Sequence, residues 1–104
     1  MDEAFISQRL GRLRTQMRVS AREMSISIGQ ANNYISNIEN GKSMPSIQGL
    51  FYICDYLKIS PSDFFDEGNT NPALLNQIIE QLKLLNENCL ESILVLLQEY
   101  TKKK

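Results

Sequence analysis

The chain has 104 residues, of which 42% are hydrophobic, and a formal net charge of −1. This length accommodates one small domain and an appendage but no separate effector-binding domain. Two cysteines and no histidine exclude the usual Cys/His metal site within one chain. We expect no cofactor, and the absence of a long apolar run or a signal peptide predicts a cytoplasmic protein.

The first predicted helix runs from Glu3 to about Met17. Apolar residues recur along it at intervals of four, three and four, which is typical of one buried helical stripe. The stripe consists of Ile6, Leu10, Leu13 and Met17. The outer face carries Arg9, Arg12 and Arg18, which we interpret as a solvated surface, with contact to a phosphate group as the alternative.

Two short helical patterns then meet at Gly29. Ser20 followed by Glu23 predicts a capping box, so a helix begins at about Ala21. The helix should end where Gly29 supplies the left-handed backbone conformation. Its inward residues are Met24 and Ile28.

The second of these helices is unusually polar. Ile35 and Ile38 form its apolar face, whereas the other faces carry Asn32, Asn33, Ser36, Asn37 and Asn40. Asparagine is a poor helix former, so a surface selected only for helix stability would carry Glu, Lys or Ala instead. We therefore expect this polar face to touch a partner.

Two further helices complete the predicted head of the chain. Ser46 should cap the first of them, and its apolar side reads Ile47, Leu50, Ile53, Cys54 and Leu57, extended by Phe51 and Tyr52. Ser60 and Pro61 should begin a last short helix that runs through Asp63. Phe64 and Phe65 should close the base of the core, and Cys54 is expected to be a buried thiol.

The rest of the chain differs in composition. Residues 66–71 are polar and precede Pro72, so they predict a linker. A helix follows with an apolar stripe of Leu74, Leu75, Ile78, Ile79, Leu82 and Leu85. Asn88 and Glu91 suggest the cap of another helix, which is apolar nearly all round and ends near Lys102, Lys103 and Lys104. Such a hairpin either folds onto its own head or meets the same hairpin of a second chain, and we favour the second.

One set of residues places the head in a family. Ser20, Glu23, Met24, Gly29, Ile35, Ile38, Glu39, Asn40, Gly41 and Lys42, followed by Pro45 and Ser46, resemble the pattern of the lambdoid phage repressor and Cro family, also called the XRE family. The resemblance covers about Phe5 to Phe65. It implies an all-α fold, with a five-helix lambda-repressor-like DNA-binding domain over residues 1–66. A linker over 67–71 and a C-terminal helical hairpin over 72–104 would follow.

The resemblance also implies roles for individual residues. Carried over on the matching positions, the DNA base contacts are Asn32, Asn33 and Asn37, and the DNA backbone contacts are Gln30, Tyr34, Asn40, Lys42 and Ser43. Tyr34 has packing on Ile38 as an alternative. Arg14 and Glu39 should form a structural pair. The sequence departs from the family at Ala31, where a capping Ser or Thr is usual, and at Ala21, where Gln is common.

The resemblance therefore implies a transcriptional regulator that binds double-stranded DNA, with a repressor that reads a pseudo-palindromic operator as a homodimer as our preferred interpretation. The dimer would form through Leu90, Ile93, Leu94 and Leu97. Residues 1–65 carry seven basic and six acidic side chains, so non-specific DNA binding should be weak. The alternative is a protein-interaction module, such as an antitoxin or an antirepressor partner. No acid/base or nucleophilic set indicates an enzyme or a small-molecule substrate.

Overall fold

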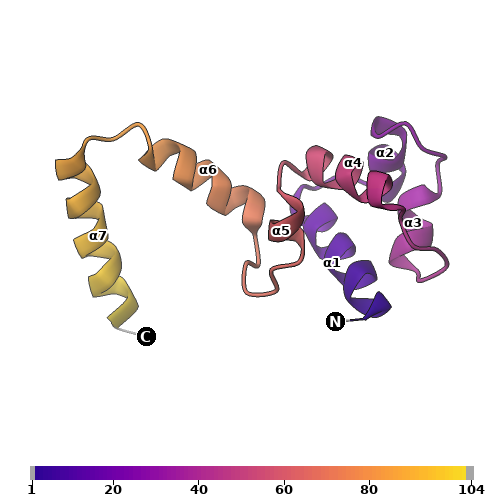
Figure 1. Cartoon of the computed structure of the whole chain (residues 1–104), viewed down its shortest axis with the longest axis horizontal. Coiled ribbons are helices and arrows are strands. Elements are labelled where there is room, and N and C mark those ends of the chain that lie inside the picture. Colours follow the sequence, from indigo (N-terminus) through magenta and orange to yellow (C-terminus); the bar gives the residue numbers. More distant parts are fainter. Residues whose placement is uncertain (1, 103–104) are drawn as a thin grey trace. The chain divides into compact units, whose positions relative to one another are not determined.

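The computed structural model describes residues 2–102, and these form helices without strands (Figure 1). The helices are α1 (Glu3–Gln16), α2 (Ala21–Ser27), α3 (Tyr34–Glu39), α4 (Ile47–Leu57), α5 (Pro61–Phe64), α6 (Pro72–Leu82) and α7 (Glu87–Lys102). They divide into a head unit that ends at Ala73 and a C-terminal unit that begins at Leu74. The predicted all-α fold is confirmed.

Polar side chains cap the starts of α1, α2, α4 and α5 in the head unit. Side-chain oxygens accept backbone amide hydrogens at Asp2, Ser20, Ser46 and Ser60, over distances of 2.9 to 3.2 Å. Only Ser60 belongs to a complete capping box, with Asp63. The capping box predicted at Ser20 is half formed, because the exposed Glu23 carboxylate is solvated and does not return a bond to the Ser20 amide.

Glycines end α2 and α3 in the same way. Gly29 has a φ of +77° and Gly41 a φ of +76°, values that carry little strain only without a Cβ. After Gly29, the amide of Gln30 donates to the carbonyl of Ser25 at 2.9 Å. After Gly41, the amide of Lys42 donates to the carbonyl of Asn37 at 2.8 Å. Both are Schellman motifs, so the predicted corner at Gly29 is confirmed.

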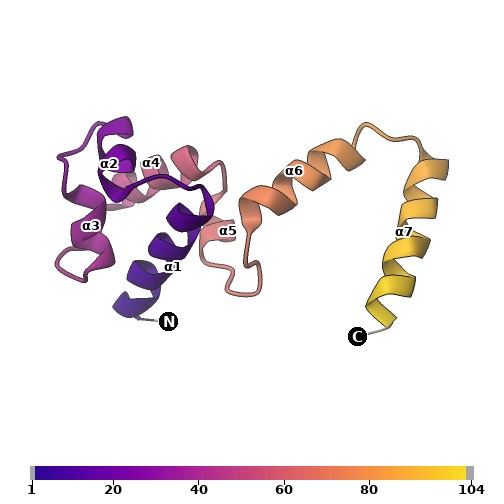
Figure 2. The same cartoon turned by 180° about the vertical axis from the view of Figure 1, so that it is seen from behind.

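The head unit packs around α3, which lies beside α1 and α2 in both views (Figures 1 and 2). The buried core consists of Leu10, Leu13, Met24, Ile35, Ile38, Ile53, Cys54, Leu57, Ile59 and Phe64. Phe64 is wholly buried, as predicted, and the half-buried Phe65 meets it edge to face with ring centroids 5.2 Å apart. Apolar side chains of the five helices α1 to α5 therefore converge on one core.

The predicted inner face of α4 is wrong for Ile47, Phe51 and Tyr52. Ile47 is 74% exposed, and Phe51 and Tyr52 are also exposed. Ile47 and Phe51 are four residues apart and share a helix face that turns away from the core. Burial begins with Gly49 and continues through Ile53, where α4 meets the rest of the head.

Cys54 is a buried thiol, as predicted, whereas Cys89 on α7 is exposed. Burial raises the pKa of Cys54 to about 11, so it stays protonated at neutral pH. Within residues 2–102, no group of three or more Cys, Asp and Glu side chains is arranged to hold a metal ion. Over the same residues, no helix combines the length and apolar character needed to cross a bilayer.

Arg9 is buried, which corrects the prediction of a solvated side chain. It is only 2% exposed, and its Nε donates to the carbonyl of Phe64 at 2.7 Å. Its Nη2 donates to the carbonyls of Asp63, Asp66 and Asn69 at 2.7 to 3.0 Å. Burial, together with the nearby Arg12, lowers its pKa. The end of α5 and the segment after it direct their carbonyls at Arg9 of α1, and a guanidinium group has enough donors to bind several of them.

The C-terminal unit leaves most of its apolar side chains exposed. Within it, the exposed large side chains of α6 are Leu74, Leu75, Ile78 and Ile79. No residue of α7 is buried, and Leu94 and Leu97 are 53% and 54% exposed. The cap of α7 is Asn86, whose side chain accepts from the amide of Cys89 at 2.9 Å, and not Asn88 as predicted. An N-cap asparagine accepts from the backbone amide three residues onward, and for Asn86 that amide belongs to Cys89. The N-cap of α7 therefore lies two residues before the predicted Asn88.

The predicted cluster of cations at the C-terminus is described only in part. Lys102 lies in the last turn of α7, where it approaches Glu99 at 3.9 Å in an exposed ion pair. Lys103 and Lys104 lie outside the described residues.

Replacing Arg9 with methionine tests the role of its guanidinium. Arg9→Met keeps the apolar stem but leaves several carbonyls without their donor, and we expect it to lower the free energy of unfolding by about 3 kcal/mol. Arg12→Met, at an exposed position of the same helix, should change it by less than about 0.5 kcal/mol. Urea unfolding followed by circular dichroism measures both, and equal stabilities would contradict the role given to Arg9.

Candidate DNA-binding surface

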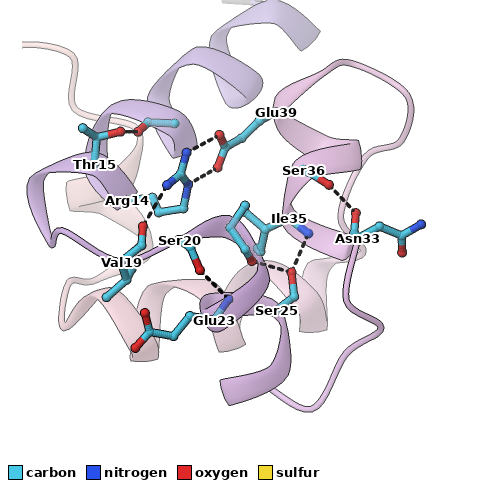
Figure 3. A network of polar contacts seen from close by, with 12 residues as sticks. Arg14, Thr15, Val19, Ser20, Glu23, Ser25, Asn33, Ile35, Ser36 and Glu39 are labelled. Carbon is cyan, nitrogen blue, oxygen red and sulfur yellow. Dashed lines mark hydrogen bonds and ion pairs between the residues drawn. The ribbon is translucent and has the colours of Figure 1, made fainter.

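The α2–turn–α3 segment presents a polar surface on one side of α3. Ile35 and Ile38 are wholly buried, so the opposite side of this short helix faces outward. Asn32 and Asn33 are exposed in the turn immediately before α3, and Asn37 is half-buried one helical turn after Asn33. Residues four apart share a helix face, so Asn33 and Asn37 lie on the same side. Figure 3 shows the Asn33 side chain pointing away from the helices.

The predicted DNA backbone contacts flank both ends of α3. Gln30 is half-buried in the turn that precedes it, whereas Asn40, Lys42 and Ser43 are exposed around its end. The amides of Lys42 and Ser43 both point at the carbonyl of Asn37, at 2.8 and 3.3 Å. These two amides are therefore committed within the protein, and only the side chains are available to a phosphate.

Tyr34 packs at the edge of the core. It is half-buried against the core cluster, and burial raises the pKa of its hydroxyl. A Cβ added to Gly49 of α4 would clash with the Tyr34 hydroxyl, so the two residues are in close contact. The ring therefore packs on α4 near Gly49, and its contact with DNA stays a prediction.

Arg14 and Glu39 join α1 to the end of α3. The Arg14 Nε donates to Glu39 Oε2 at 2.6 Å, and Nη2 donates to Oε1 at 3.0 Å (Figure 3). The third nitrogen, Nη1, donates to the carbonyl of Val19 at 2.8 Å. The bond to Glu39 is the main cause that raises the pKa of Arg14. This two-point contact fixes both the distance and the orientation of α3 relative to α1.

Sequence reasoning missed Ser25, a wholly buried residue of α2 whose side chain is bonded to α3. Its hydroxyl accepts from the amide of Ile35 at 3.0 Å and donates to the carbonyl of Ala21 at 2.7 Å. A signal for it was present in the sequence. Ala31 cannot cap α3, so the amides at the start of that helix need an acceptor from elsewhere.

Comparison with known families decides the identity of this arrangement. The sequence model of a family described as helix-turn-helix, of the lambda repressor/Cro-like or XRE type, matches residues 10–64. The chain belongs to this family. XRE-type helix-turn-helix proteins are DNA-binding regulators, and the domain itself is not enzymatic. No curated protein and no solved structure is significantly similar to the chain.

The bond between Arg14 and Glu39 gives a stability prediction for this helix-turn-helix domain. Glu39→Gln removes the charge from a partly buried pair, and we expect a loss of about 2 kcal/mol in the free energy of unfolding. Glu23→Gln makes the same chemical change at an exposed position on α2 and should cost less than about 0.5 kcal/mol. Urea unfolding compares the two variants, and an equal, small effect would show that the pair does not hold α3.

Proposed function

We propose that this helix-turn-helix protein is a transcriptional repressor that binds a pseudo-palindromic operator as a homodimer. The observation that carries the proposal is the outward polar surface of α3 and the turn before it, formed by Asn32, Asn33 and Asn37. The buried face of the same helix is wholly apolar, with Ile35 and Ile38 both 0% exposed. A helix held in this way can enter the major groove with its asparagines toward the bases.

Asparagine suits the reading of adenine. Its side-chain amide donates and accepts together, which matches N7 and N6 of adenine, and each such pair contributes about 1–3 kcal/mol of discrimination against the wrong base. Asn33 makes no capping bond to α3, so its amide is not committed to the backbone. We expect half-sites that contain A·T pairs.

The DNA backbone contacts are assigned to Gln30, Tyr34, Asn40, Lys42 and Ser43. Such contacts position the protein on the duplex without reading its sequence. Lys42 is the one basic residue in this set, and residues 1–65 have a net charge of only +1. The sequence-independent share of the affinity should therefore be small, so recognition depends on base contacts and on the pairing of two heads.

We assign that pairing to the C-terminal unit, with a second copy of the chain as its partner. Exposed apolar side chains cover both α6 and α7, and an apolar surface of this kind marks an interaction site. On α7 the interface would contain Leu90, Ile93, Leu94 and Leu97. Two heads related by a twofold axis bind half-sites about 10 base pairs apart. Occupation of a promoter by such a dimer blocks transcription without any further activity.

A second candidate function is a protein-interaction module, such as an antitoxin or an antirepressor partner. The near-neutral head and the exposed leucine-rich C-terminal unit favour it. Retention on DNA resin separates the two functions, because a DNA reader is held at low salt and released as salt rises. A protein that is never retained at low salt would favour the interaction module.

Selection from a pool of random duplexes, followed by sequencing, tests the proposed operator. We expect enrichment of an inverted repeat, and the double variant Asn32→Ala/Asn33→Ala should lose at least about 2 kcal/mol of binding to it while its melting temperature stays nearly unchanged. Asn88→Ala, which changes an exposed asparagine on α7, is the control and should bind like the wild type. A large fall in the melting temperature of the double variant would contradict a surface role for Asn32 and Asn33.

Charge placed on α7 tests the dimer. Leu94→Glu/Leu97→Glu buries charges in the proposed interface, so sedimentation should show monomers at concentrations where the wild type is dimeric. Leu84→Glu is the matched control, because Leu84 is 78% exposed between α6 and α7 and lies outside the assigned set. A wild-type chain that sediments as a monomer, or a double variant that stays dimeric, would contradict the assignment.

A further inference from the structure

The start of α3 lacks the cap that usually satisfies a helix N-terminus. Ala31 has no side-chain acceptor, and Asn33, at the N-cap position, makes no side-chain capping bond. The first amides of a helix have no partner within the helix. A missing cap lowers the stability of α3 more than that of a long helix, because a helix of six residues has few internal hydrogen bonds.

Ser25 of α2 supplies an acceptor to this end of α3 from inside the core. Its Oγ is the acceptor for the amide of Ile35, at 3.0 Å, in a wholly buried environment. The same hydroxyl donates to the carbonyl of Ala21 at 2.7 Å. Because its hydrogen is used on Ala21, the oxygen presents a lone pair to Ile35. Figure 3 shows the bond from the Ile35 amide of α3 to the Ser25 hydroxyl of α2.

Ser25 also holds the turn that leads to α3. Its backbone carbonyl accepts from the amide of Gln30 at 2.9 Å, in the motif that ends α2 at Gly29. One residue of α2 therefore fixes the end of its own helix through its carbonyl and the start of α3 through its side chain. The segment between these two bonds contains Asn32 and Asn33.

We propose that Ser25 is a positioning residue for base reading. Its hydroxyl caps α3 from the core side, so the side-chain amide of Asn33 is not needed as a cap and faces outward. It also sets the register of the asparagines relative to α2. This inference rests on the proposed DNA-reading function of α3. Alanine at position 25 leaves the buried Ile35 amide without an acceptor, and threonine would add a methyl group where Ser25 has no exposed surface.

The test compares operator binding with stability. At a temperature where circular dichroism shows a folded protein, Ser25→Ala should weaken binding to the most enriched duplex by about tenfold or more. Binding to a scrambled duplex of the same composition should change by less than about threefold, because that binding depends on charge. Ile53→Val, a core change on α4, should lower the melting temperature without changing the preference for the enriched duplex.

Moving the acceptor to the usual family position provides a control variant. Ala31→Ser places its acceptor near the amide of Tyr34, which already donates to the carbonyl of Ala31 at 3.0 Å, and gives no acceptor to the amide of Ile35. Ser25→Ala/Ala31→Ser should therefore bind the operator as weakly as Ser25→Ala. A Ser25→Ala protein that is folded and keeps its full preference for the enriched duplex would overturn the proposal.

Amide hydrogen exchange in the wild type requires neither DNA nor a folded variant. The Ile35 amide should exchange far more slowly than the exposed Asn33 amide, because only the first has a buried acceptor. Equal, fast exchange would overturn the cap itself. A slow Ile35 amide in a protein that prefers no duplex would instead contradict DNA reading, so the two failures are distinguishable.

Discussion

The head unit depends on the burial of Ile35 and Ile38, which form the inner face of α3. A six-residue helix is not stable alone, so its conformation comes from packing and from the bonds at its ends. Ser25 holds its start, and Arg14 holds its end through Glu39. With the inner face and both ends fixed from within the protein, the outer face can carry asparagines that contribute little to helix stability. In the function that we propose, this support holds a poor helix-forming surface in place for contact with DNA.

The predictions that succeeded were those with local signals. Gly29 ends α2 because a left-handed residue is required there, and Ser46 and Ser60 begin helices because their hydroxyls reach amides three residues onward. The family pattern also covers this part of the chain. These features depend on neighbours in sequence, so spacing alone identifies them.

The predictions that failed depend on distant parts of the chain. Arg9 has the sequence context of a solvated arginine, but the carbonyls that surround it lie more than fifty residues away. Ile47 fits the periodicity of α4, yet it lies with Phe51 on a face of that helix that turns away from the core. Ser25 occupies an unremarkable helix position, and only the packing of α2 on α3 brings its hydroxyl to the Ile35 amide. The family resemblance implied the asparagine surface and the Arg14–Glu39 pair at the end of α3, but no pattern indicated the support that Ser25 gives to its start.

The proposed function depends most on base contacts by Asn32, Asn33 and Asn37. The most direct test is an NMR titration of the labelled protein with its most enriched duplex, following the side-chain amide signals of asparagine. We expect the signals of these three residues to shift strongly, while those of Asn86 and Asn88 in the C-terminal unit do not. Unshifted signals from Asn32, Asn33 and Asn37 in a saturated complex would contradict it.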